Sequence, residues 1–95
     1  MGTYVDDMRA PFGRMIMCHL LADSPEELHA MADRIGIARK WFQRKASSPH
    51  YDIALSKRAL ALKAGAIEVV GRDFLPDFLV RIRPGWPRDE KGQWK

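Results

Sequence analysis

The sequence has very little cysteine and no long apolar run. Cys18 is the only cysteine among 95 residues, which excludes an internal disulfide and a four-cysteine zinc site and is typical of the reducing cytosol. The longest apolar run, residues 15–22, contains His19 and is far too short to span a membrane. Residues 1–7 lack the basic and apolar regions of a secretory signal, so we expect a cytoplasmic protein that does not bind membranes.

The common short signatures of catalysis and ligand binding are also missing. The chain contains no HExxH, no paired CxxC, no GxGxxG and no Walker phosphate loop. With 46% hydrophobic and 29% charged residues, the composition is that of a folded globular protein. A chain of this length supplies one small domain.

The net charge of +4 is concentrated at the C-terminal end. Residues 81–95 hold five basic and two acidic side chains, so they carry +3 of that charge. The body is nearly balanced and does not by itself require a nucleic-acid-binding face. We therefore expect a domain over residues 1–83 and a basic tail over residues 84–95. The tail should be mobile or docked only by Trp86 and Trp94, and its removal should leave the fold nearly intact.

Hydrophobic patterns and turn residues predict alternating strands and helices. Capping residues and glycine stops indicate helices over residues 24–36, 56–65 and 73–82, the last with Pro76 in its first turn. Short β-rich runs predict strands at residues 3–5, 15–21, 37–42, 50–53 and 66–70, and residues 8–14 read as a loop. This order predicts a small α/β fold, three-layer-like, with a mostly parallel short sheet and about three helices.

Two aspartates directly follow the first predicted strand. Asp6 and Asp7 could hold Mg²⁺, a cation that prefers oxygen ligands, at the edge where α/β sheets collect ligands. The alternative is that both carboxylates cap the loop and pair with Arg9 and Arg14.

A second group of candidates surrounds the start of the helix at residue 56. His50 and Asp52 would share one face of an extended segment, so the carboxylate could orient the imidazole as a base. Cations in the first helical turn oppose the macrodipole by roughly 0.3–1 kcal/mol each, and a bound phosphate would reverse this penalty. The alternative is a local pair between Asp52 and Arg58 with solvated cations. The candidate ligand-binding residues here are His50, Tyr51, Asp52, Ser56, Lys57 and Arg58, and Asp6, Asp7, Arg14 and His19 complete the predicted ligand-binding set.

Two further features each have a structural and a functional interpretation. His19 is either a neutral, hydrogen-bonded histidine or a third member of a mixed nitrogen and oxygen metal site with Asp6 and His50, if the fold brings them together. Residues 39–45 interleave basic and aromatic side chains that could stack bases, or they form a strand with one buried aromatic and a solvated loop. His29 lies off the apolar stripe of its helix and is expected to face solvent.

Taken together, several segments resemble a family of short bacterial and phage proteins catalogued as domain of unknown function 4031. The resemblance covers roughly residues 3 to 83 and implies a small cytosolic protein, frequent in phages and their hosts, without indicating an activity. It rests on residues 4–8, 13–15, 19–23, 26–29, Trp41, 50–52, 56–58 and 64–66.

Three functions remain open at this stage. The first is binding of a phosphate-containing small molecule or nucleotide at a sheet edge, without chemistry. The second is a metal-dependent phosphoesterase or nuclease-like enzyme, with Asp6, Asp7 and either Asp52 or His50 around the metal. The third is a protein-interaction adaptor that acts through the basic tail with Trp86 and Trp94. The sequence leaves the oligomeric state open, with a homodimer as one alternative.

Overall fold

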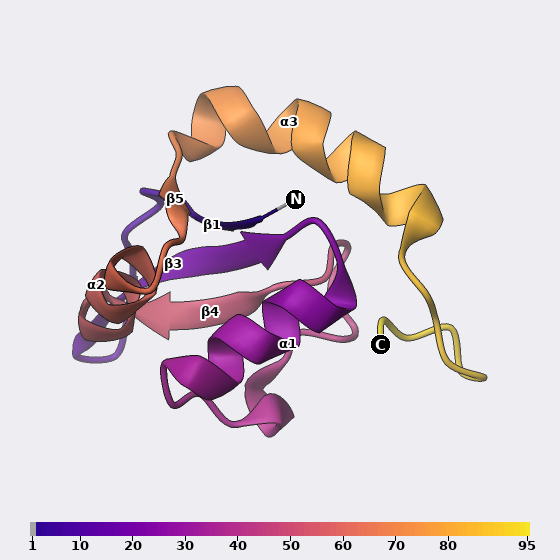
Figure 1. Ribbon diagram of the computed structural model, residues 1–95, viewed down its shortest axis with the longest axis horizontal. Coiled ribbons are helices and arrows are strands. Elements are labelled where there is room, and N and C mark those ends of the chain that lie inside the picture. The colour runs from indigo at the N-terminus through magenta and orange to yellow at the C-terminus, as the bar shows by residue number, and fades with distance from the viewer. Residues whose placement is uncertain (1) are drawn as a thin grey trace.

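The computed structural model describes residues 2–95, which form one mixed sheet with helices on both faces (Figure 1). The strands are β1 (Thr3–Val5), β2 (Ala10–Phe12), β3 (Met15–Ala22), β4 (Tyr51–Ala54) and β5 (Ile67–Glu68). The helices are α1 (Pro25–Arg34), α2 (Leu55–Lys63) and α3 (Gly71–Ile82), with 3₁₀ turns η1 (Arg39–Trp41) and η2 (Arg83–Gly85). The predicted α/β class with three helices is confirmed. Within residues 2–95, no helix has the length and apolar character needed to cross a bilayer.

Strand β3 is the centre of the sheet. It pairs antiparallel with β1 and β2 along one edge and with β4 along the other, while β5 extends the sheet parallel to β1. The sheet is therefore mixed, with one parallel pairing, rather than mostly parallel. The reason is local: a tight turn at Gly13, where φ is +60°, returns the chain directly beside itself, and a hairpin of this kind is antiparallel.

Strands β1 and β2 are one arm interrupted by a bulge. Val5 pairs with Leu20 and Ala10 pairs with Met17. The four residues 6–9 therefore lie opposite only two residues of β3, Cys18 and His19. Arg9 adopts φ +51° within this bulge, a conformation that non-glycine residues rarely take. Bulges redirect side chains and backbone groups, and this one places Asp6 over β3. The prediction of a loop over residues 8–14 missed β2, because Pro11 is tolerated in an edge strand.

The two faces of the sheet differ in how completely helices cover them. Tyr51, Leu20 and Ile53 are fully buried on the face against α1 and α2. On the opposite face Tyr4 packs against Phe74 and Phe78 of α3, with ring centroids 4.9 and 5.1 Å apart. Helix α3 covers only the β1 side of that face (Figure 1), so the β3–β4 side remains partly accessible.

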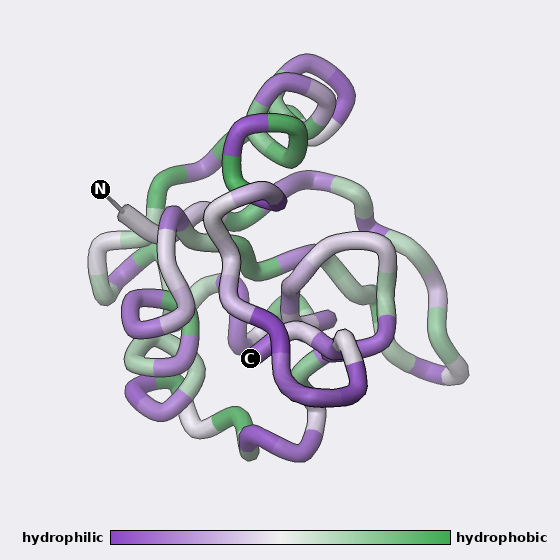
Figure 2. Tube along the Cα trace, turned by 90° about the vertical axis from the view of Figure 1, so that its right-hand side faces the viewer, coloured by the Kyte–Doolittle hydropathy of each residue, from purple (hydrophilic) through white to green (hydrophobic). Residues whose placement is uncertain are grey.

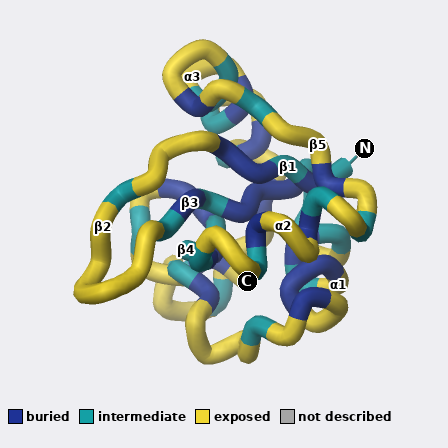
Figure 3. The backbone as a smooth tube through the Cα atoms, turned by 90° about the vertical axis from the view of Figure 1, so that its left-hand side faces the viewer, coloured by how far each residue is buried: buried dark blue, intermediate teal, exposed yellow. Residues whose placement is uncertain are grey.

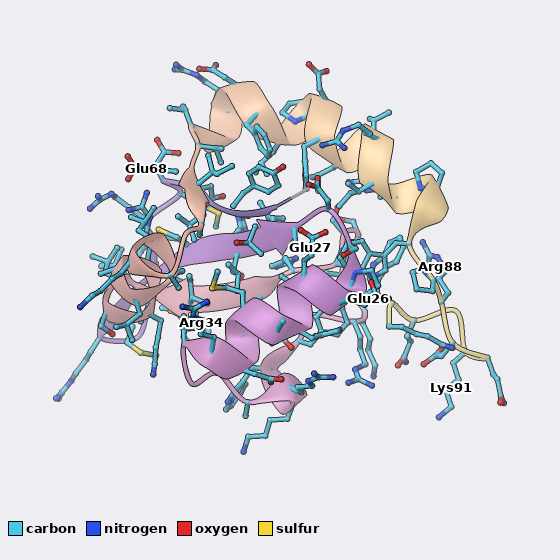
Figure 4. The ribbon with its side chains drawn as sticks, in the orientation of Figure 1. Glu26, Glu27, Arg34, Glu68, Arg88 and Lys91 are labelled. Carbon is cyan, nitrogen blue, oxygen red and sulfur yellow. The ribbon has the colours of Figure 1, made fainter. Side chains whose placement is uncertain are left out.

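Helix α1 begins as its sequence predicts. Ser24 is the N-cap, and its hydroxyl accepts a hydrogen bond from the Glu27 backbone N–H. Glu26 and Glu27 lie at the N-terminal end and Arg34 near the C-terminal end (Figure 4), an arrangement that complements the helix macrodipole.

We expect the substitution Ser24→Ala to lower the free energy of unfolding by about 1 kcal/mol, because it leaves an N-terminal backbone donor without a partner. Urea denaturation followed by circular dichroism measures this change. Ser47→Ala, at an exposed loop serine, is the control and should change stability by less than about 0.5 kcal/mol. Equal effects of the two substitutions would contradict the capping role.

Two predicted elements differ from the structure. Residues 37–42 form no strand: the chain makes the turn η1, and only Phe42 bridges to Tyr51. Helix α3 begins at Gly71 rather than Asp73, because the Asp7 carboxylate accepts the Gly71 backbone N–H at 2.9 Å and caps the helix from a distant part of the chain. Pro76 consequently lies in the second helical turn rather than the first.

The C-terminal segment, residues 84–95, packs onto the domain. Trp86 and Trp94 are 5% and 2% exposed, although the segment is largely hydrophilic or intermediate in hydropathy (Figure 2). The Trp94 indole donates to the Ala46 carbonyl at 2.8 Å, and its backbone N–H donates to the Arg44 carbonyl. The segment is thus held by backbone hydrogen bonds as well as by its tryptophans.

Candidate functional site

Two histidines and an aspartate converge on the accessible side of the sheet. The register of β3 and β4 places His19 opposite Asp52, and His50 lies just before β4. The Asp52 Oδ1 atom is 3.2 Å from His50 Nε2 and 3.8 Å from His19 Nε2. One donor atom from each of the three residues lies within 4.8 Å of the other two.

Asp6 orients the His19 ring. Its Oδ2 atom lies 2.6 Å from His19 Nδ1, and its Oδ1 atom accepts the backbone N–H groups of His19 and Met8. A carboxylate only accepts hydrogen bonds, so Nδ1 carries the proton and Nε2 points its lone pair toward Asp52 when the ring is neutral. The bulge makes these contacts possible, because it leaves the backbone N–H groups of His19 and Met8 free to donate to the Asp6 carboxylate.

The backbone orients the His50 ring in the same way. Both ring nitrogens of His50 face acceptors, the Ser48 carbonyl oxygen 2.9 Å from Nδ1 and Asp52 Oδ1 3.2 Å from Nε2. In the neutral tautomer that donates from Nδ1 to Ser48, the lone pair is on Nε2. The Ser48 hydroxyl accepts two hydrogen bonds from the Arg83 guanidinium, at 3.0 and 2.7 Å. Arg83 therefore ties the loop that carries His50 to the end of α3.

The two cations at the start of α2 have partners within the protein. Arg58 is 7% exposed and donates to the Asp6 carbonyl at 2.9 Å and to Glu68 at 2.8 Å. Glu68 lies at the outer edge of β5 (Figure 4). Lys57 donates to the Ile35 carbonyl at the end of α1. These contacts account structurally for basic residues that oppose the macrodipole of α2.

The environments of the titratable groups separate their pKa values. Burial raises the pKa of Asp6, but the hydrogen bonds from the His19 ring and backbone outweigh it and hold the pKa below 3.8. The hydrogen bond to Asp6 raises the pKa of His19 above 6.5 despite burial. Burial lowers the pKa of His50 below 6.5, and the nearby charge of His19 adds to this effect.

In metal-free protein, NMR of the imidazole nitrogens should show His19 titrating above pH 6.5 and His50 below it. The raised pKa of His19 contributes stability that is complete below pH 6.5 and is lost as the pH rises through its folded-state pKa. The lowered pKa of His50 has the opposite sign, because its contribution is lost as the pH falls through its folded-state pKa. Asp6→Asn should bring the pKa of His19 down. A His19 titration that is identical in the two proteins would show that Asp6 does not hold the ring.

The three converging residues fit a divalent transition metal. Tetrahedral ligands at about 2.0–2.1 Å from zinc lie about 3.3 Å from one another. The separations from Asp52 Oδ1 to the two histidines, 3.2 and 3.8 Å, bracket that distance, while the third separation, between the two histidines, lies within 4.8 Å, so the rings would have to move together to bind one ion. Each histidine already has an outer hydrogen-bond partner, Asp6 or the Ser48 carbonyl, of the kind that fixes metal-binding imidazoles. The side chains of His19, His50 and Asp52 are 20%, 15% and 40% exposed, so a metal there would keep a position open to solvent.

The structure places the remaining predicted residues elsewhere. Arg14 is exposed at the hairpin turn, and Ser56 is exposed in the first turn of α2. Tyr51 faces the other side of the sheet, where its hydroxyl bonds to His29 Nδ1 at 2.8 Å. His29 also contacts the Lys95 carbonyl, so the expectation that it simply faces solvent was wrong.

The predicted pair of aspartates does not act as a pair in the structure. Asp6 holds His19, and Asp7 caps α3. The sequence grouped His50 with Asp52 and proposed a metal site of His19, His50 and Asp6, but in the structure Asp52 takes the place expected for Asp6, which lies behind His19 on Nδ1. The roles of Ser48 and Arg83 had no signal in the sequence. They depend on contacts between residues 35 positions apart.

A hollow of about 720 Å³ lies away from these residues, between α1, the loop around Phe42 and the C-terminal segment. Arg39 in its wall pairs with Asp33, and His29 is held by Tyr51 and Lys95. Because these groups already have protein partners, we place the candidate site at His19, His50 and Asp52.

Comparisons with known proteins identify the family without indicating an activity. No curated protein and no solved structure matches the chain. A family model described as protein of unknown function (DUF4031) matches residues 3–79. The match includes His19, His50, Asp52 and Asp6, and it ends before the C-terminal segment. The chain belongs to the DUF4031 family.

Proposed function

We propose that the protein binds one divalent transition metal through His19, His50 and Asp52 and hydrolyses a phosphate ester there. The observation that carries the proposal is the convergence of two Nε2 atoms and a carboxylate oxygen within 4.8 Å, with both rings fixed at Nδ1. Nitrogen and carboxylate donors in this combination suit zinc, iron or manganese better than magnesium, which prefers oxygen ligands.

Charge supports an anionic substrate. The donor set contains one carboxylate and two neutral imidazoles, so a divalent ion and its ligands would carry a net charge of +1, which the Asp6 carboxylate on His19 offsets. The positive charge available to a substrate comes from Arg9 and Arg14, which are exposed on the neighbouring hairpin. A phosphate ester is the anionic substrate class that this arrangement favours.

The reaction would add a water oxygen to phosphorus and break the ester P–O bond, with the proton from water leaving on the alcohol. When bound, the metal supplies Lewis acidity and lowers the pKa of water. Asp6 keeps His19 in the tautomer that presents Nε2, and the Ser48 carbonyl does the same for His50. The protein thus contributes a preset donor geometry.

Two other functions stay predictions with less support. A module that binds a phosphorylated ligand or nucleotide without turnover would use the same centre, since Lys57 and Arg58 are occupied by protein groups. An adaptor acting through the tail tryptophans has less support, because Trp86 and Trp94 are buried. The proposal places the protein in the cytoplasm of a bacterial cell, because a reducing compartment suits its free thiol, Cys18. The same proposal applies if the protein is encoded by a phage.

Hydrolysis of bis(p-nitrophenyl) phosphate tests the proposal. Metal-stripped protein should be inactive, and addition of Zn²⁺, Mn²⁺ or Fe²⁺ should restore activity to the native protein. Asp6→Asn should weaken metal affinity by about 10–100-fold, as loss of a ligand-orienting partner does elsewhere. Metal binding without any turnover of diester or monoester substrates would support the binding module instead, and hydrolysis that persists after metal removal would refute the metal centre.

A further inference from the structure

The hairpin arm, residues 8–17, projects from the body of the protein (Figure 3), and its β3 strand continues to His19, which pairs with Asp52 of β4. Met15, Met17 and His19 alternate along β3 and so share one face of the sheet. Register places Phe12 opposite Met15, and Ala10 opposite Met17. An apolar strip, formed by Phe12, Met15 and Met17, therefore runs from the hairpin turn to the proposed metal ligand.

The strip is unusually accessible for apolar side chains. Phe12 is 69% exposed and Met15 is 47% exposed, and the neighbouring Met8 is 52% exposed. Helix α3 packs on the β1 side of the same face and leaves the arm uncovered. A contiguous group of exposed large apolar residues is typical of an interaction surface.

Charge defines the partner more narrowly. The arm contains two basic residues, Arg9 and Arg14, both exposed, and no acidic residue. A strip with an aromatic ring and thioethers, on an arm that also carries two exposed arginines, matches a polyanion that carries stackable rings. The four steps along β3 from Met15 to His19 span about 13 Å, so the backbone of a polyanion lying on the strip would reach the metal-binding donors.

We propose that the hairpin arm binds single-stranded nucleic acid, stacks a base on Phe12 and leads a phosphodiester further along the same nucleic-acid strand to the site at His19, His50 and Asp52. This inference rests on the proposed phosphoesterase function and names its substrate class. Arg9 and Arg14 contact the phosphates, while the thioethers of Met15 and Met17 line the path between the stacked base and the metal ligands.

Fluorescence anisotropy with a labelled twelve-nucleotide oligothymidylate, measured on metal-free protein in EDTA, separates binding from cleavage. Phe12→Ala should weaken binding by about 10-fold, and Phe12→Tyr should restore it, because stacking needs only an aromatic face. Arg14→Gln should weaken binding and reduce its salt dependence. Trp41→Ala is the matched control: Trp41 is a 59% exposed aromatic beside Lys40, away from the arm, and its loss should leave affinity unchanged.

The outcomes distinguish this inference from the proposed function. Hydrolysis of bis(p-nitrophenyl) phosphate should be unaffected by Phe12→Ala, because the small diester does not extend to the arm. Diester hydrolysis without oligonucleotide binding, or binding lost through Trp41→Ala instead of Phe12→Ala, would overturn the inference and leave the phosphoesterase standing. Phe12-dependent binding to phosphatidylglycerol vesicles but not to oligonucleotide would assign the arm to a membrane surface. Phe12-dependent oligonucleotide binding without hydrolysis of any ester would support the arm and refute the enzyme.

Discussion

Trp94→Ala should lower the free energy of unfolding by about 3–5 kcal/mol, the range typical of a buried tryptophan truncated to alanine. Trp94 is 2% exposed, donates its indole N–H to the Ala46 carbonyl and lies beneath Arg88, whose guanidinium carbon is 3.7 Å from the ring centroid. Because small domains have only 5–15 kcal/mol of stability, this loss is a large part of the total. Urea titration at constant temperature measures it.

Trp41→Ala is the control for this prediction, since Trp41 is 59% exposed and its removal should change stability by less than about 0.5 kcal/mol. Truncation after Arg83 should destabilise the protein more than Trp94→Ala, because it removes Trp86 and the backbone hydrogen bonds as well. If the truncated chain unfolds at the same temperature as the full-length protein, residues 84–95 are the independent tail that their composition suggests.

His50→Ala should abolish metal-dependent phosphodiester hydrolysis, by about 1,000-fold or more, because the metal supplies several kcal/mol of transition-state stabilisation. The measurement is kcat/KM for bis(p-nitrophenyl) phosphate at saturating Zn²⁺ or Mn²⁺. His29→Gln is the matched control, since His29 lies on the opposite side of the sheet and contacts Tyr51 and Lys95. Circular dichroism establishes that each variant is folded.

Retention of full activity by His50→Ala would refute the proposed site. Equal losses in His50→Ala and His29→Gln would indicate a general effect on folding rather than on metal binding.

Local signals in the sequence predicted the helices well. Ser24 and Glu27 lie within a few residues of each other, so the cap of α1 is readable from the chain alone. The start of α3 was misplaced because its cap comes from Asp7, 64 residues earlier. Strand β2 was not predicted, because Pro11 and Gly13 locally indicate a loop. In the structure the pairing with β3 makes residues 10–12 a strand.

The candidate site shows the same division. Residue types nominated His19, His50, Asp52 and Asp6. Which of them meet depends on the register between β3 and β4 and, for Asp6, on the two-residue shift between β1 and β2 in their pairing with β3. The charge pattern at α2 predicted an anion for Lys57 and Arg58. In the fold these cations instead close α1 and support the Asp6 backbone, and both contacts join residues more than 20 positions apart.

Crystals grown with one equivalent of Zn²⁺ and measured at the zinc absorption edge test the central claim most directly. The account predicts one strong anomalous peak at about 2.0–2.2 Å from His19 Nε2, His50 Nε2 and an Asp52 carboxylate oxygen, with Asp6 still on His19 Nδ1. The same experiment on His50→Ala should show no peak there. Zinc bound only elsewhere on the native protein, or no bound zinc at all, would contradict the account.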